Sequence, residues 1–134
     1  MPATDRPPAL ETDLVREFVA NAHGDLEAVR TALVDHPSLA NACWDWGGGD
    51  WETALGAASH VGRRDIAEQL LGYGARLEVF AAAMLGELEV VRAVLTAHPE
   101  TLNALGPHGI PLRAHAEAGG EQARAVLKLL DSSA

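Results

Sequence analysis

The sequence predicts an all-α protein, a solenoid of about four helix-turn-helix repeats, and three observations support this prediction. One stretch occurs twice: ANAHGDLEAVRTALVDHPSLANA at 20–42 returns as AAMLGELEVVRAVLTAHPETLNA at 82–104. Glycines at 24, 62, 86 and 119 punctuate the chain, and apolar residues recur at helical spacing after each of them. A repeated unit buries its apolar face only by stacking on further units, so the repetition itself predicts the solenoid.

Each unit is expected to consist of two antiparallel helices joined near its glycine. We place a single domain at 10–131 and a flexible tail with three prolines at 1–9. The four repeats are placed at 12–42, 43–76, 77–104 and 105–131. The second helices are expected to bury Leu26, Val29, Leu33 and Val34 in the first unit, Ile66, Leu70 and Leu71 in the second, Leu88, Val91, Val94 and Leu95 in the third, and Val126, Leu127, Leu129 and Leu130 in the fourth.

The connections between units differ in length. The glycines are 38 residues apart between Gly24 and Gly62, 24 between Gly62 and Gly86, and 33 between Gly86 and Gly119. The second unit therefore has an enlarged β-hairpin finger, and the third unit has almost none.

These units resemble ankyrin repeats, whose length is about 33 residues. Gly109-Ile110-Pro111-Leu112 matches the family's G-x-T-P-L opening except at Ile110, and Thr53-Ala54-Leu55 followed by Gly62 is a second match. The resemblance covers about 12–130 and extends to short, stand-alone bacterial ankyrin proteins with a similar glycine-tryptophan finger. It implies an ankyrin solenoid with short, irregular β-turn fingers. It also implies that the finger tips and first helices line a concave face that binds a protein or peptide.

Charge and cysteine content restrict the partners and the compartment. The chain has 19 acidic and 10 basic residues, and the basic ones are scattered, which argues against a nucleic acid or an anionic membrane as partner. The only cysteine, Cys43, favours a reducing cytoplasmic location. The longest apolar run, at 79–85, is too short to span a membrane.

The finger at 43–52 carries all three tryptophans of the chain, together with acidic residues. Exposed aromatic side chains beside carboxylates are typical of a binding hot spot or a cation cage. The alternative is that the tryptophans fold inward and fill the gap left by the missing third finger. Either way, the finger contributes these candidate binding residues: Trp44, Trp46, Asp50, Trp51 and Glu52.

Further candidates come from the first helices and from the tip of the fourth finger. They are His60, Phe80, Met84, Leu85 and His108. Met84 and Leu85 form an exposed apolar patch unless the long finger of the second unit covers them. The histidines show no H-x-x-x-H or H-E-x-x-H spacing, so we assign no metal ion, no cofactor and no catalytic residue.

The function that we expect is a non-enzymatic interaction module that binds a protein or peptide through its concave face and the Trp finger. One alternative is a small-molecule or metal-binding protein, an enzyme included, with a pocket between the Trp finger and His60, His108 and His115. Another is a homo-oligomer assembled through Met84, Leu85 and the finger. We therefore expect a monomer or a weak homo-oligomer.

Overall fold

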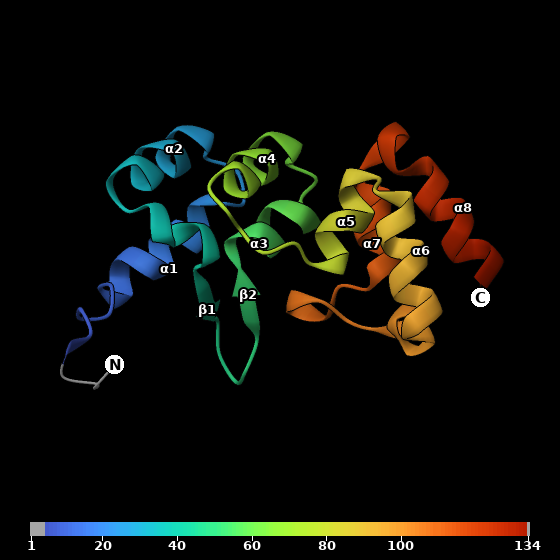
Figure 1. The fold of residues 1–134 in the computed structure, drawn as a ribbon, viewed down its shortest axis with the longest axis horizontal. Coiled ribbons are helices and arrows are strands. Elements are labelled where there is room, and N and C mark those ends of the chain that lie inside the picture. Colours follow the sequence, from blue (N-terminus) through green and yellow to red (C-terminus); the bar gives the residue numbers. More distant parts are fainter. Residues whose placement is uncertain (1–4, 134) are drawn as a thin grey trace.

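The computed structural model describes residues 5–133, and over this range the chain is mostly helical with one small two-stranded sheet (Figure 1). The all-α prediction is confirmed at this level. The helices form four consecutive pairs: α1 (Thr12–Asn21) with α2 (Leu26–Asp35), α3 (Ala54–His60) with α4 (Arg64–Gly72), α5 (Val79–Leu85) with α6 (Leu88–Ala97), and α7 (Leu112–Ala118) with α8 (Arg124–Ser133). Of the expected tail, residues 1–4 lie outside the described residues, and residues 6–10 are exposed and belong to no helix or strand. Among the described helices, none has both the length and the apolar character needed to cross a membrane.

The duplicated stretch takes up the same backbone structure in both copies. Helix α2 ends at His36, with φ −138° and ψ 78°, and the 3₁₀ turn η2 (Pro37–Asn41) follows. Helix α6 ends at His98, with φ −135° and ψ 76°, before η3 (Pro99–Asn103). The proline that follows each histidine excludes the helical region for that residue, so both helices end at the same place in the repeat.

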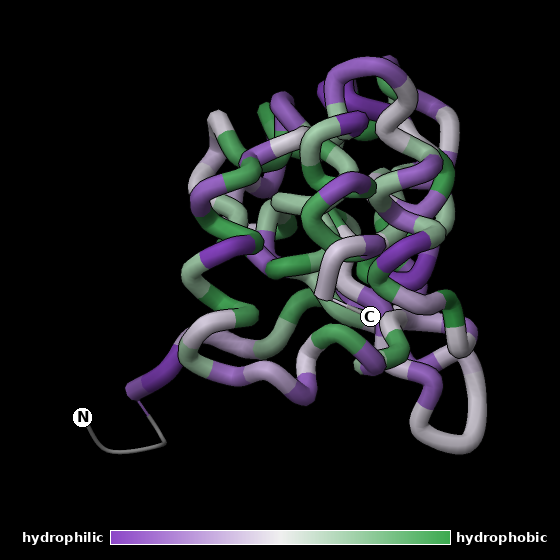
Figure 2. The backbone as a smooth tube through the Cα atoms, turned by 90° about the vertical axis from the view of Figure 1, so that its right-hand side faces the viewer, coloured by the Kyte–Doolittle hydropathy of each residue, from purple (hydrophilic) through white to green (hydrophobic). Residues whose placement is uncertain are grey.

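The first helices of the four units pack side by side, α1 on α3, α3 on α5 and α5 on α7, and α2 packs on α4 and α6 on α8. Along the helices, the colour in Figure 2 changes between green and purple, as expected for helices with one buried face. Helices α3 and α5 are rich in alanines, which are fully buried. Their small side chains allow the first helices to approach closely.

The second helices bury the expected apolar faces with one exception. Val29, Leu33, Ile66, Leu70, Val91, Val126 and Leu130 are buried, and the other expected residues apart from Val34 are half-buried. The prediction for Val34 is wrong, because its side chain is 70% exposed. Val34 lies one residue beyond Leu33 and is therefore rotated by about 100° from the stripe that α2 presents to its neighbours.

The finger of the second unit is a β-hairpin that projects away from the helices (Figure 1). Strand β1 (Cys43–Asp45) pairs antiparallel with β2 (Trp51–Thr53), and Trp44 lies opposite Glu52. The segment between α4 and α5 contains no strand. In Figure 1 the connection before α7, which contains the short turn η4 (Pro107–Gly109), extends instead toward the hairpin.

The side chain of Thr53 joins the hairpin to α3 and to the segment before α5. Its hydroxyl accepts a hydrogen bond from Gly56 N at 2.8 Å and donates one to Glu78 at 2.5 Å. We expect Thr53→Ala to lower the free energy of unfolding by about 1–2 kcal/mol, because it removes a helix cap and a hydrogen bond to a largely buried carboxyl. Urea unfolding in the presence of a chelator measures this change. Thr96→Ala, which alters an exposed threonine of α6, is the control, and equal losses in both variants would contradict the role of the cap.

Candidate metal centre

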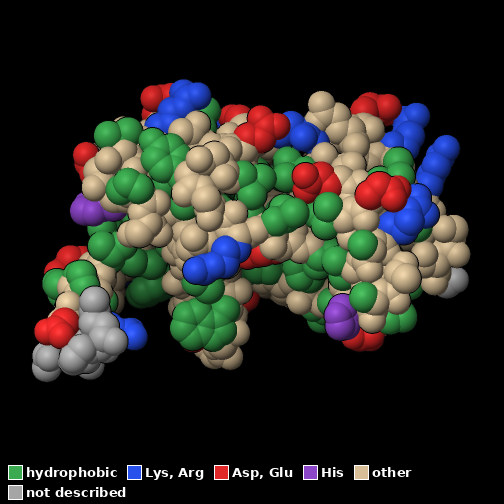
Figure 3. All heavy atoms as spheres, in the orientation of Figure 1, with side chains coloured by type: hydrophobic (Ala, Val, Ile, Leu, Met, Phe, Trp, Pro, Cys, Tyr) green, Lys and Arg blue, Asp and Glu red, His purple; other side chains and the backbone are tan. Residues whose placement is uncertain are grey.

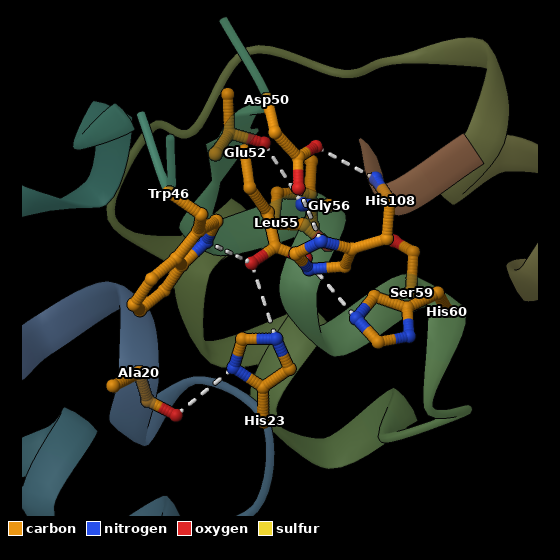
Figure 4. A network of polar contacts seen from close by, with 11 residues as sticks. Ala20, His23, Trp46, Asp50, Glu52, Leu55, Gly56, Ser59, His60 and His108 are labelled. Atoms are coloured by element: carbon orange, nitrogen blue, oxygen red, sulfur yellow. Dashed lines mark hydrogen bonds and ion pairs between the residues drawn. The ribbon is translucent and has the colours of Figure 1, made fainter. Parts of the chain in front are cut away.

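Four side chains from separate segments converge beside the hairpin (Figure 4). His23 lies in the turn between α1 and α2, Glu52 lies on β2, and His60 is the last residue of α3. His108 lies in η4. Each residue offers one atom of a kind that binds metal ions, and these atoms all lie within 4.8 Å of one another. We call these four residues the histidine–glutamate cluster.

The three imidazoles direct the same ring nitrogen at one carboxylate. The Nε2 atom of His23 lies 3.1 Å from Oε1 of Glu52, and the Nε2 atoms of His60 and His108 each lie 3.1 Å from its Oε2. The side chain of Glu52 is fully buried. Its Oε2 and the Nε2 of His60 are both buried and have no hydrogen-bond partner within the described part of the chain. Buried polar atoms in folded proteins are normally satisfied, so these two require an explanation.

The other ring nitrogen, Nδ1, faces an oxygen acceptor in both His23 and His108. Nδ1 of His23 lies 3.0 Å from the carbonyl oxygen of Ala20, and Nδ1 of His108 lies 2.6 Å from Oδ2 of Asp50. A carbonyl oxygen only accepts, so Nδ1 of His23 carries the proton. The carboxylate of Asp50 favours the same tautomer in His108. This arrangement, with Nδ1 bonded to an oxygen and Nε2 free, is typical of metal-binding histidines.

The backbone of His108 is held in a conformation that residues other than glycine seldom adopt. Its φ is 62°, and no other non-glycine residue in the described part of the chain has a positive φ. Asp50 holds it from the hairpin, because Oδ1 of Asp50 accepts a hydrogen bond from His108 N at 2.8 Å while Oδ2 contacts the ring. Such strain costs of order 1–3 kcal/mol and is concentrated at functional sites.

The carboxylate is also held by the hairpin itself. Nε1 of Trp46 donates a hydrogen bond to Oε1 of Glu52 at 2.8 Å. The indole packs edge-on to the ring of His23, with 6.3 Å between centroids. Trp46 therefore orients Glu52 and forms one wall of the cluster, while 37% of its own surface remains exposed.

The electrostatics of the cluster favour an ionised carboxylate. Burial by itself would raise the pKa of the Glu52 carboxyl, but the contacts with His23 and Trp46 outweigh burial and hold the pKa below its ordinary value. The contact with Glu52 raises the pKa of His23. Burial lowers the pKa of His60, and the neighbouring His23 and His108 lower it further. An ionised carboxylate and a neutral imidazole are the forms that bind metal ions, so a bound ion would displace the second proton that Glu52 favours on His23.

The four donor atoms are close enough together for one metal ion to lie between them, since all lie within 4.8 Å of one another. A zinc ion with ligands at about 2.0–2.1 Å requires its ligand atoms to lie about 3.3 Å apart. The three contacts between nitrogen and oxygen are each 3.1 Å long, one to Oε1 and two to Oε2. The donor atoms lie up to 4.8 Å apart, so the side chains would draw together around an ion. Three imidazole nitrogens and one carboxylate oxygen form a complete donor set for a divalent transition-metal ion.

The structure brings together several of the residues predicted from sequence. Glu52, His60 and His108 belong to the cluster, and Trp46 and Asp50 support it. The resemblance places His23 with His60 on the concave face, but sequence reasoning did not include His23 among the candidate binding residues or join it to Glu52 and His108. The ligands come from four segments, so no spacing test could find them. The resemblance to ankyrin repeats, which places the end of each first helix on the concave face, is the signal that points to His23.

The other predicted residues lie apart from the cluster. Trp44 packs against the core, whereas Trp51 is 61% exposed. Phe80 packs on the buried ring of His115, with 4.7 Å between ring centroids, and neither belongs to the cluster. Of the two arrangements left open for Met84, exposed or covered, the structure has the covered one, because its side chain is fully buried in the core. Leu85 is half-buried. The close packing of α5 on α7 covers this end of α5.

Acidic and basic side chains are intermixed on the surface, as the scattered positions of the basic residues in the sequence predict. Acidic and basic side chains lie next to one another along the upper edge of the face in Figure 3. Several of them form ion pairs within a helix, such as Arg30 with Glu27 and Arg92 with Glu89. The histidine–glutamate cluster is therefore distinguished by its geometry and burial and not by a surrounding field of one sign.

No family model, curated protein or solved structure matches the chain at a significant level.

Proposed function

We propose that this protein binds one divalent transition-metal ion, with zinc as the best match, through the Nε2 atoms of His23, His60 and His108 and the carboxylate of Glu52. One observation carries the proposal: three imidazoles from different segments direct Nε2 at a single, fully buried carboxylate.

The protonation states of the cluster support a cation. When Nδ1 carries the proton, a neutral imidazole presents the lone pair of Nε2, as His23 and His108 would do toward the oxygens of Glu52. Lone pairs that face a carboxylate repel it. In the metal-free protein a second proton on His23, whose pKa Glu52 raises, relieves the repulsion at Oε1, whereas Oε2 still faces Nε2 of both His60 and His108. A single divalent ion satisfies all four groups at once.

The donor set favours zinc and its neighbours over magnesium or calcium. The two latter ions prefer six or more oxygen ligands, whereas imidazole nitrogen suits zinc, cobalt, nickel and copper. Outer contacts of the kind that orient metal ligands are also present, from Ala20 to His23, from Asp50 to His108 and from Trp46 to Glu52.

Titration calorimetry on tag-free protein that has been stripped with a chelator tests the proposal. We expect one zinc ion per chain with a dissociation constant below about 10 µM, and a large loss of affinity in His60→Ala. His98→Ala alters an exposed histidine outside the cluster and is the matched control, with unchanged binding. The absence of zinc binding to the wild-type protein, or equal binding by both variants, would overturn the proposal.

Asp50 provides a separate test, because it contacts His108 and is not one of the four ligands. We expect Asp50→Asn to weaken zinc binding by about 10- to 100-fold, because the ring of His108 loses the carboxylate that orients it. The same titration measures the effect. Asp45→Asn changes a carboxylate at the turn end of the same hairpin, whose Oδ1 accepts hydrogen bonds from Gly47 N and Gly49 N, and should leave zinc affinity unchanged. An effect of Asp45→Asn as large as that of Asp50→Asn would argue against a specific role for Asp50.

A second candidate function is the binding of a protein or peptide through the hairpin. The observation that favours it is the exposure of Trp51, since 61% of its surface is accessible on a projecting strand and tryptophan is enriched in binding hot spots. Affinity capture with wild-type and Trp51→Ala proteins as matched baits tests it. A partner that is retained by the wild type and lost by the variant would support this function, and equal retention would contradict it.

A further inference from the structure

The apolar core of the chain is divided into two clusters that meet at α5. One cluster contains buried residues of α1 to α4 together with Ala81 and Met84, and the other contains Ala82, Ala83 and buried residues of α6 to α8. The packing of a solenoid is dominated by contacts between neighbouring units, so its two ends can unfold separately. A contact between the second and fourth units, which bypasses the third, would couple the unfolding of the two ends.

Helices α3 and α7 already pack on each other, and the histidine–glutamate cluster adds a second contact between these two units. His23, Glu52 and His60 belong to the segments of the first two units, whereas His108 belongs to the fourth. The segment between α4 and α5 carries no hairpin, so the connection before α7 reaches the hairpin of the second unit directly (Figure 1). His108 N donates to Asp50 across this gap, which corresponds to a sequence separation of 58 residues.

The connection that carries His108 has little regular structure of its own. It is closed by an isolated bridge between Leu105 and Pro111 and by a hydrogen bond of 2.8 Å from Gly106 N to Ile110 O. His108 itself has the strained, positive φ. The attachment of His108 to the hairpin must therefore compensate for this strain. A metal ion would bind His108 of the fourth unit together with three ligands from the first two units.

We infer that the metal ion strengthens the link that the packing of α3 on α7 provides between the two halves of the solenoid, so that the fourth unit (α7 and α8) and the first two units unfold as one cooperative body when the ion is bound. This inference rests on the proposed function. The four protein donors complete a tetrahedral shell, which gives the ion a structural role and leaves no coordination position for a substrate. His108 is the residue through which the ion acts on the C-terminal half.

Hydrogen exchange of the full chain, with saturating zinc or with a chelator, tests the inference. In the chelator we expect amides of α8 to exchange at least about tenfold faster than those of α2, because the C-terminal half opens by itself. With zinc, we expect α8 to be protected to the level of α2, and the peptide that contains residues 105–111 to be protected as well. Persistence of the difference between α8 and α2 in samples that calorimetry shows to be saturated would overturn the inference and leave the proposed function intact.

The variant His108→Ala separates binding from coupling. It keeps His23, Glu52 and His60, which all belong to the first two units, so zinc at high concentration should still protect α2. Because the link through the ion to the fourth unit is lost, α8 should stay as unprotected as in the chelator. Zinc-dependent protection of α8 in this variant would contradict the role of His108. His98→Ala, which leaves the cluster intact, should behave like the wild type.

Discussion

Glu52→Gln is expected to weaken zinc binding by at least a hundredfold, which corresponds to about 2.7 kcal/mol of binding free energy. The amide oxygen of glutamine can still accept the hydrogen bond from Trp46, so the side chain keeps its place in the hairpin. What it loses is the negative charge that faces three imidazole nitrogens. Calorimetry with zinc measures this loss.

The same variant has a second expected effect, on the metal-free protein. Glu52 is fully buried and ionised, and its contact with His23 stabilises both groups. We expect its neutralisation to lower the free energy of unfolding in chelator by about 1–3 kcal/mol, as measured with urea. Glu27→Gln, which changes an exposed glutamate paired with Arg30, should alter neither quantity. Unchanged zinc affinity in Glu52→Gln would remove Glu52 from the ligand set.

Gly86→Ala is expected to lower the free energy of unfolding by at least about 2 kcal/mol, which is a large part of the stability of a domain of this size. Gly86 ends α5 with φ 79°, a left-handed conformation that costs alanine about 1 kcal/mol or more. In addition, a Cβ at this position would collide with the backbone carbonyl of Gln122 in η5 (Gly120–Ala123). Backbone cannot rotate away as a flexible side chain can, so the overlap adds a cost of about 1–3 kcal/mol.

Two further glycines separate these contributions. Gly119 has an ordinary φ of −74°, but a Cβ there would collide with the carbonyl of Met84, so Gly119→Ala measures the cost of overlap alone. Gly72 has no atom within 4 Å of the Cβ position, and Gly72→Ala should change the free energy of unfolding by less than about 0.5 kcal/mol. Urea unfolding of the three variants measures how much unfolding free energy each substitution removes. A stability of Gly86→Ala equal to that of Gly72→Ala would show that α5 and η5 are not packed closely.

The sequence by itself determined the helices and their order. The duplication of 20–42 in 82–104 and the helical spacing of apolar residues predicted helix pairs, and the spacing of the glycines predicted a long finger in the second unit and almost none in the third. Helical periodicity and the effect of proline on the residue before it act between residues close in the chain. For this reason they can be read without knowledge of the tertiary structure.

The tertiary structure decided which residues meet and which side chains are covered. Val34 has the same apolar character as Leu33, yet it faces solvent because α2 has neighbours on one side only. The tryptophans, for which the sequence left exposed and packed arrangements open, divide between Trp44 against the core and Trp51 in solvent. Burial of a side chain depends on what packs over it, and composition does not contain that information.

The histidine–glutamate cluster is the clearest case of a feature that only the tertiary structure decided. Sequence analysis selected Glu52, His60 and His108 as binding residues but did not join them to His23 or assign a metal ion. These residues belong to four segments, and no two of the histidines have a spacing typical of a metal site. They converge because the third unit lacks a hairpin and the fourth unit reaches across the gap to the second. Coordination requires atoms a few ångströms apart in space, and here the packing of whole units sets that distance.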